Sequence, residues 1–309
     1  MADGTTQTIS NTLIADTCKS QICIVTRACD LYFSAIEIGG FSSIEIPGMN
    51  EGEDPEPEPD TVTDITNPFS ASAADETNGA NVADSALKDY FTLDLRQGGC
   101  TVSDGKYHMT AINGIHTDMN GKYFVTLKDH STAGATGRMW VVVRGYYSVT
   151  TNSTINGYYN DDDNKQLGHS GIYTRIQDGK LYIMLKFYNP SRPNRISNKT
   201  FVIDCEGDDL TVADDGNTVY ILVDGKTYAT IQLNGTANYA DATSTAGGFA
   251  AEAVVTLADG TTQTISNTLI ADTYKSQICI VTRACDLYFS AIEIGGFSSI
   301  EIPSVSVKE

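Results

Sequence analysis

Aromatic and arginine side chains alternate with apolar ones along three stretches near the middle of the chain, 138–149, 171–176 and 180–188. Successive side chains of a β-strand point to opposite faces of its sheet, so this alternation predicts an apolar face and a second face of another kind. The second face, expected to be outward and concave, would gather Trp140, Arg144, Tyr173, Arg175, Tyr182 and Tyr188. Aromatic rings stack on the apolar side of a sugar, and Arg bonds its hydroxyls or pairs with acidic sugars. We therefore predict a glycan-binding face; the alternative is that these side chains only cover the sheet beneath loops.

A second signal is the string 160–164, which reads Asn-Asp-Asp-Asp-Asn and is dense in the oxygen ligands that Ca²⁺ prefers. The string lacks the order of an EF-hand loop, so a solvated turn is the simpler interpretation. The alternative is a structural Ca²⁺ held by Asp161, Asp162 and Asp163, and we otherwise expect no cofactor. A weaker candidate group for Ca²⁺ is formed by Asp208, Asp209, Asp214 and Asp215.

Signatures of common catalytic sites are missing from the sequence. The segment 168–171, Gly-His-Ser-Gly, does not have the order of a nucleophile elbow. The four histidines are not spaced as zinc ligands, the seven cysteines form no C-x-x-C pair, and there is no P-loop. A disulfide between Cys100 and Cys205 stays open. These absences predict a protein that is not an enzyme.

The composition excludes several classes of partner. Asp and Glu total 39 against 20 Lys and Arg, a formal net charge of −19, which opposes binding to nucleic acid phosphates or to an anionic membrane surface. No apolar stretch approaches the ~18 residues of a spanning helix. We therefore expect neither nucleic acid binding nor membrane insertion.

From Tyr90 onward, the sequence predicts β-structure almost everywhere. Short runs rich in Val, Ile, Thr, Tyr and Phe are separated by Asp-Gly or Asn-Gly pairs, which supply the positive φ angles of tight hairpins. No amphipathic helix longer than two turns is predicted. About fifteen such strands predict an all-β, two-sheet antiparallel sandwich of the jelly-roll type. The runs are 90–95, 106–112, 122–128, 138–149, 171–176, 180–188, 200–205, 210–213, 218–223, 228–233, 250–257, 261–268, 277–282, 286–294 and 298–302.

A near-perfect repeat sets the domain organisation. Residues 2–47 recur as 258–303 with a single difference, Cys18 against Tyr274. The later copy can complete the sandwich, whereas the earlier one has no strands before it and resembles the end of a preceding tandem repeat. We predict an orphan copy over 1–47, an acidic Pro-rich linker over 48–64 and a sandwich domain over 65–309. The orphan copy would permit self-association by strand exchange through residues 2–47; the alternative is an accident of where the gene is bounded.

Two stretches carry a resemblance to a known family. Residues 210–226, Leu-Thr-Val-Ala-Asp-Asp-Gly-Asn-Thr-Val-Tyr-Ile-Leu-Val-Asp-Gly-Lys, and 277–294, which contain Asp286-Leu-Tyr-Phe289, resemble the closing half of a concanavalin A-like (laminin G-like) jelly roll. Ser290-Ala291 replaces the Asp-Asn usual in that family. The resemblance implies glycan or protein binding, or polysaccharide cleavage. The paired carboxylates of the glucanase branch, E-x-D-x-E on one strand, are absent.

We therefore predict a non-catalytic carbohydrate-binding or adhesion module of a repetitive bacterial protein, located outside the cell or on its surface. Its partner would be a glycan or a host surface protein. The first alternative is a structural spacer or host-protein-binding repeat. A polysaccharide lyase or hydrolase with an unfamiliar site is the second alternative, and it would need a cluster of Tyr, His and Arg or two close carboxylates.

Overall fold

The computed structural model divides the chain into two units, Met1–Pro59 and Asp60–Glu309. The residues that it describes all lie in the second unit; they are 62–95, 99–111, 113–134, 138–145, 171–188, 196–237, 249–271 and 276–304. The predicted orphan copy over 1–47 and most of the predicted linker lie outside these residues. Both stay predictions.

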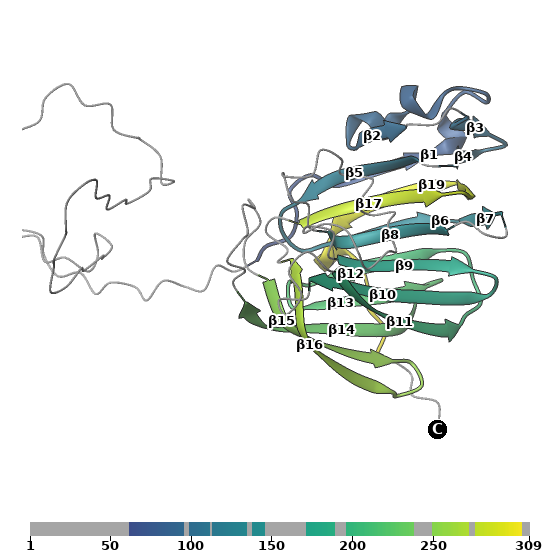
Figure 1. Ribbon diagram of the computed structural model, residues 1–309. Helices are drawn as coiled ribbons and strands as arrows, with labels where there is room; N and C mark the ends of the chain where they lie inside the picture. Colours follow the sequence, from purple (N-terminus) through teal and green to yellow (C-terminus); the bar gives the residue numbers. More distant parts are fainter. Residues whose placement is uncertain are drawn as a thin grey trace, which may run out of the picture. The chain divides into compact units, whose positions relative to one another are not determined.

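The described residues form two large antiparallel sheets and one small one (Figure 1). The seven-stranded sheet has the order β11 (Ile196–Asp204), β10 (Lys180–Tyr188), β9 (Gly171–Gln177), β8 (Arg138–Gly145), β17 (Ser276–Arg283), β5 (Asn113–Met119) and β2 (Thr92–Leu95). The eight-stranded sheet has the order β1 (Phe69–Ser72), β19 (Ala291–Gly296), β6 (Tyr123–Lys128), β12 (Leu210–Asp214), β13 (Thr218–Val223), β14 (Lys226–Ala237), β15 (Phe249–Leu257) and β16 (Thr262–Ala271). The four-stranded sheet has the order β3 (Thr101–Ser103), β4 (Lys106–Met109), β18 (Asp286–Phe289) and β7 (Ser131–Ala133).

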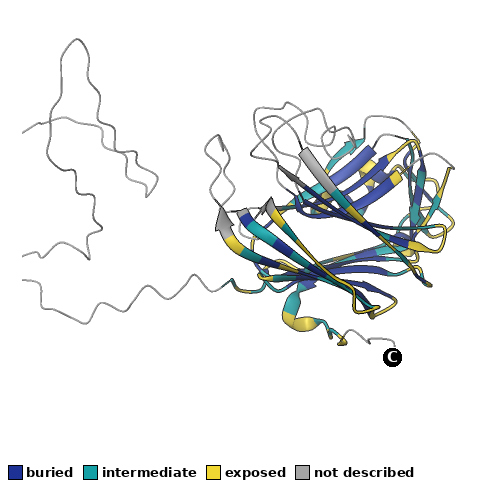
Figure 2. Ribbon diagram, turned by 60° about the horizontal axis from the view of Figure 1, so that its bottom comes forward, coloured by how far each residue is buried: buried dark blue, intermediate teal, exposed yellow. Residues whose placement is uncertain are grey.

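The main core lies between the two large sheets, where the inward side chains of both are buried (Figure 2). Leu181, Ile183 and Leu185 of β10 each have no exposed surface, as their alternation with polar residues predicted. Each such side chain stabilises the fold by about 1.5–3 kcal/mol relative to leaving it in water. The prediction of an all-β, concanavalin A-like jelly-roll sandwich is confirmed.

Hairpin turns occur where the Asp-Gly pairs predicted them. Both residues of Asp104-Gly105, Asp178-Gly179 and Asp224-Gly225 have positive φ, between 48° and 73°. Two consecutive positive φ angles define the type I′ turn, whose twist matches that of the flanking strands. These pairs therefore fix the register of β3–β4, β9–β10 and β13–β14.

The end of the chain departs from the predicted strands. The single strand expected over 286–294 is broken at Ser290, so that β18 joins the four-stranded sheet and β19 the eight-stranded one. The Ser290 backbone N–H and hydroxyl both donate to the carbonyl oxygen of Lys128, which holds the break. The strand expected over 298–302 does not form. Its first residues belong to a short 3-10 helix, η6 (Phe297–Ser299), and the residues that follow are irregular.

Cys100 and Cys205 are both buried free thiols, so the disulfide between them does not form. Among the described residues, no helix has the length and apolarity required to span a membrane.

Candidate functional site

Four of the six predicted ligand-binding side chains meet on the outer face of the seven-stranded sheet. The guanidinium carbon of Arg175 lies 4.3 Å from the ring centre of Trp140 and 4.4 Å from that of Tyr182, so the cation stands between two aromatic rings. Tyr173 meets Trp140 edge to face, with ring centres 5.8 Å apart. Strand register causes this convergence, because Tyr173 lies opposite Val142 and Tyr182 lies opposite Arg175. Whether these residues bind a ligand stays a prediction.

These side chains are more buried than an open binding face requires. Trp140 is 5% exposed and Tyr173 is fully buried, and both pack with Val142, Met184, Cys279 and Val281 in a second apolar cluster. Their rings contact each other and the Arg175 cation. The stacking surfaces predicted for a sugar are therefore largely occupied within the protein.

Arg175 is the unusual member of this cluster because two donor atoms of its buried guanidinium group have no hydrogen-bond partner. The residue is 8% exposed, and its Nε and Nη1 atoms have no hydrogen-bond partner. Burial, followed by the positive charge of Arg138, lowers the pKa of Arg175 to about 10. A buried donor without an acceptor costs about 1–3 kcal/mol, and more when it is charged, so this arrangement lowers the stability of the fold.

Arg144 does not join the group. Two residues of β8, Val143 and Arg144, stand opposite the single residue Ile278 of β17, which makes a β-bulge, and Arg144 has a φ of 51°. A bulge interrupts the alternation of side chains and re-aims the residue within it. Arg144 consequently points between the two large sheets. There its Nε and Nη2 donate to the Asp214 carboxylate at 2.5 and 2.8 Å, and Nη2 also donates to the carbonyl oxygen of Gly216.

Four of the remaining predicted residues have side chains outside the described part of the chain. Tyr188 is the last residue of β10, but its side chain lies outside the described residues, as do Asp161, Asp162 and Asp163. Within the described ranges, no group of three or more His, Cys, Asp or Glu side chains could hold a metal ion. The weaker Ca²⁺ candidate lies within these ranges and does not form such a group; it consists of Asp208, Asp209, Asp214 and Asp215. The Ca²⁺ site at 161–163 stays a prediction.

Sequence reasoning missed a histidine on the same outer face. His116 lies on β5, opposite Cys279, in the row of residues that continues through Val142 to Tyr173. Burial lowers the pKa of His116 below its usual value, and the negative charges of Asp118 and then Asp94 raise it in part. Asp118 accepts a hydrogen bond of 2.8 Å from the Gln277 side-chain amide. A partly buried imidazole near two carboxylates has the composition of an acid–base site.

The strand that carries His116 was not predicted because its first residues, Asn113-Gly114, are typical of turns. A signal was present in the alternation of Ile115, Thr117 and Met119 with His116 and Asp118, which matches the period of a strand. Asp94 joins from β2, where it lies opposite Gly114. Only the register of β2, β5 and β17 brings these polar residues together.

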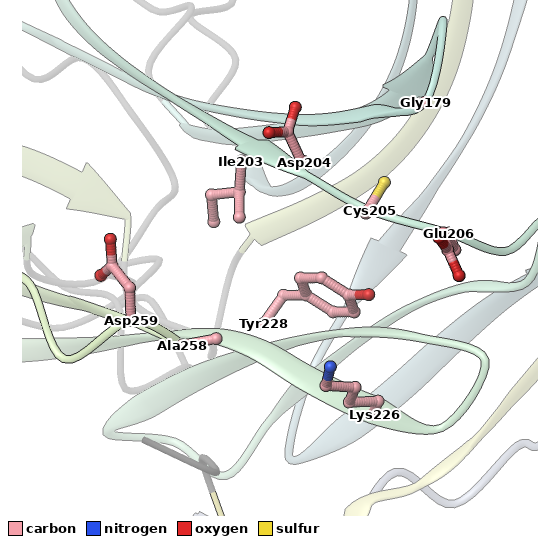
Figure 3. Close-up of a pocket in the computed structure, with 9 residues that line it drawn as sticks. All are labelled: Gly179, Ile203, Asp204, Cys205, Glu206, Lys226, Tyr228, Ala258 and Asp259. Carbon is pink, nitrogen blue, oxygen red and sulfur yellow. The ribbon is translucent and has the colours of Figure 1, made fainter. Parts of the chain in front are cut away.

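A separate cleft of about 690 Å³ lies between β11 of the seven-stranded sheet and β14 of the eight-stranded sheet (Figure 3). Its lining is Gly179, Ile203, Asp204, Cys205, Glu206, Lys226, Tyr228, Ala258 and Asp259. Lys226 stands 5.0 Å from the ring centre of Tyr228, and Asp204 pairs with Lys180. Burial raises the pKa of the Cys205 thiol, which keeps it a poor nucleophile. None of the predicted site residues lies in this cleft, and its lining residues suggest no reaction.

Comparison with solved structures describes the fold more closely than the activity. One matched structure is described with endo-acting O-glycanases, which prominent members of the human gut microbiota express to initiate mucin breakdown. It is 10% identical to this chain with a TM-score of 0.40, and the match covers 81% of this chain and 98% of the other. A Bacillus licheniformis beta-glucanase matches at 10% identity and 0.37, covering 74% and 99%. The kappa-carrageenase from Pseudoalteromonas carrageenovora matches at 9% identity and 0.35, covering 79% and 99%. No protein-family model and no curated protein sequence matches the chain.

This comparison contradicts the prediction of a non-catalytic binding or adhesion module, and with it the prediction that the protein is not an enzyme. The three structures are those of enzymes that act on glycans. The prediction relied on missing catalytic signatures, among them the paired carboxylates of the glucanase branch, and gave His116 no role because β5 was not recognised. Any activity of this chain has to be argued from its own side chains.

Proposed function

We propose that the domain is an extracellular polysaccharide-cleaving enzyme that works on the outer face of its seven-stranded sheet, with His116 as the general acid–base group. The observation that carries the proposal is the position of His116, near Asp94 and Asp118 and on the same face as Arg175, Trp140 and Tyr182. Histidine is the side chain best suited to exchange protons near neutral pH. Its lowered pKa keeps the imidazole neutral, and so ready to accept a proton, at pH 7.

The spacing of the two groups favours a polymer over a small sugar. β5, which carries His116, and β9, which carries Arg175, are three strand spacings apart in the sheet. Three spacings of ~4.8 Å amount to roughly 14 Å, more than one sugar ring spans. A chain lying across the strands would therefore contact Arg175 with one sugar unit and His116 with another. An enzyme that cleaves polysaccharides would act outside the cell, which agrees with the proposed location.

The experiment is an assay for new reducing ends on a panel of polysaccharides, with the wild-type chain and a His116→Gln variant. We expect cleavage of at least one polysaccharide and a fall in kcat of about 10²–10⁴-fold in the variant, the usual contribution of a general acid–base group. His108→Gln is the matched control, because His108 stacks on Tyr288 in the small sheet, away from this face. Unchanged kcat in His116→Gln, or no cleavage of any polysaccharide, would reject the proposal.

A second proposal concerns self-association. Residues 258–303 supply β17, which lies between β8 and β5, and β19, which lies between β1 and β6, so both are interior strands. Residues 2–47 repeat that sequence and could replace it in a second copy of the chain without changing any inward side chain of β17 or β19. Light-scattering mass measurements on the full chain should then find dimers or larger species. A mass that stays monomeric at all concentrations would count against exchange.

A further inference from the structure

The eight-stranded sheet ends at β16 in an edge that lacks the usual protection (Figure 1). An edge strand presents a row of backbone N–H and C=O groups, which native proteins protect with short strands, charged side chains, proline or covering elements. β16 (Thr262–Ala271) is ten residues long and contains no charged residue and no proline. Within the described part of the chain, only β15 pairs with it. Its other side is therefore open to a further strand.

The other edges of the two large sheets are protected in these ways. β1 and β2 are each four residues long, and β2 contains Asp94. β11 carries Lys199 and Asp204, and Asp204 pairs with Lys180 of the neighbouring β10. Among the edges of these two sheets in the described residues, β16 is the one that is both long and uncharged.

The hairpin between β15 and β16 determines which residues of β16 face the open side. The Leu257 N–H donates to the carbonyl oxygen of Thr261 at 2.9 Å, so Thr261 faces β15. Backbone groups point alternately to the two sides of an antiparallel strand, so every second residue from Thr261 also faces β15. The residues between them face outward and have exposed side chains; they are Thr262, Thr264 and Ser266.

We infer that β16 pairs antiparallel with β16 of a second copy of the chain, so that the two eight-stranded sheets become continuous. Thr264 then lies opposite its own counterpart on a two-fold axis and Thr262 lies opposite Ser266, and each opposed pair exchanges two backbone hydrogen bonds. The hydroxyls of these opposed residues lie on one face, where they can bond each other. Thr256 and Thr262 already form such a pair within the hairpin, with hydroxyl oxygens 3.3 Å apart. This inference does not depend on the proposed cleavage activity.

A second copy fits this edge better than a disordered peptide does. Its β16 already has extended backbone, whereas a peptide loses conformational entropy when it becomes a strand. The formal net charge of −19 makes two copies repel each other, so they approach most easily where the surface strand carries no charge. Two identical edges also form a closed pair, because a two-fold interface uses the same patch on both copies.

The test is the mass of the full chain, measured by sedimentation over a range of concentrations. We expect the wild type to form dimers. Thr264→Pro removes an outward N–H that β15 does not use, and we expect it to weaken dimerisation about tenfold or more with little change in melting temperature. A wild-type chain that stays monomeric, or a Thr264→Pro variant that dimerises equally well, would overturn the inference.

A pair of charge variants tests the register without proline. Thr264→Lys places two like charges opposite each other on the two-fold axis, so it should also weaken dimerisation about tenfold or more, although it lowers the net negative charge. Thr264→Glu should have the same effect by itself. Mixing the two variants places opposite charges across the axis and should restore the dimer. A mixture that remains monomeric would contradict this register and the inference with it.

The repeated sequence supplies the matched control. Thr8 occupies in residues 2–47 the position that Thr264 occupies in 258–303. Thr8→Pro should leave edge-to-edge dimers unchanged, whereas strand exchange through 2–47 would be weakened by Thr8→Pro and not by Thr264→Pro. Loss of dimers in Thr8→Pro alone would overturn the edge pairing and favour exchange. Equal losses in both variants would mean that residues 2–47 take part in the contact, and would overturn it as well.

Discussion

Arg144 and Arg175 lie on the neighbouring strands β8 and β9, and both are almost fully buried, at 2% and 8% exposure. Arg144 has a bidentate carboxylate partner in Asp214 and also donates to a backbone carbonyl oxygen. Arg175 has two aromatic rings, while its Nε and Nη1 have no acceptor. The first arrangement is satisfied by hydrogen bonds within the protein, whereas the second leaves two buried donors without an acceptor. Burial alone therefore does not decide whether a buried charge is satisfied; its hydrogen bonds do.

Substitution by Met at each position should change the unfolding free energy by very different amounts, and this difference is the strongest test of the comparison. Arg144→Met leaves the Asp214 carboxylate, which has no exposed surface, without its cation, and removal of one partner of a buried pair costs about 3–5 kcal/mol of unfolding free energy. Arg175→Met leaves no carboxylate behind and keeps the packing against the rings. We expect its unfolding free energy to stay within about 1 kcal/mol of the wild type.

Urea unfolding of the wild type and of the two variants measures these differences. Asp129→Asn is a useful control, since Asp129 pairs with Lys106 at the surface and should change stability by less than about 1 kcal/mol. If Arg175→Met were as destabilising as Arg144→Met, then Arg175 would be a structural residue and its role in ligand binding would have to be abandoned.

These two arginines show which side-chain positions could be predicted from the sequence alone. Alternation in 171–176 and 180–188 correctly placed Arg175 and Tyr182 on the face opposite the main core. The same rule put Arg144 there as well and was wrong, because one extra residue in β8 forms a bulge. Bulges depend on how two strands pair, and 277–283 and 138–145, which pair here, lie far apart in the sequence. His116 was missed because Asn113-Gly114 is typical of turns, so its strand was not predicted, and because its partner Cys279 on β17 is distant in sequence.

His130 shows a third way to bury a basic group, which is to keep it neutral. It is 3% exposed, its Nδ1 lies 2.5 Å from the carbonyl oxygen of Asp208, and burial lowers its pKa. Since its folded pKa lies below the unfolded value near 6.5, the unfolded chain takes up the proton first as the pH falls. Its stabilising contribution is therefore complete above about pH 6.5 and is lost as the pH decreases from there towards the folded pKa.

The measurement is the unfolding free energy as a function of pH for the wild type and for His130→Gln. One such group contributes a slope of at most about 1.4 kcal/mol per pH unit, so we expect the variant to lose part of the decline below pH 6.5. His108→Gln, in the small sheet, is the control. An identical decline in wild type and His130→Gln would mean that His130 takes up its proton in the folded state, contrary to this comparison.

The smallest expected effect concerns His116, whose pKa depends only in part on the two nearby carboxylates. Asp118 and Asp94 raise the pKa of His116 against the lowering caused by burial. Asp118→Asn removes one of those charges, so the pKa of His116 should fall further and the acid limb of kcat/KM should move to lower pH. Asp104→Asn, in the hairpin turn between β3 and β4, should leave the limb in place. A shift of the limb to higher pH would mean that another group is the essential base. The direction of the shift thus separates an electrostatic role of Asp118 from a purely structural one, which would change the rate at every pH equally.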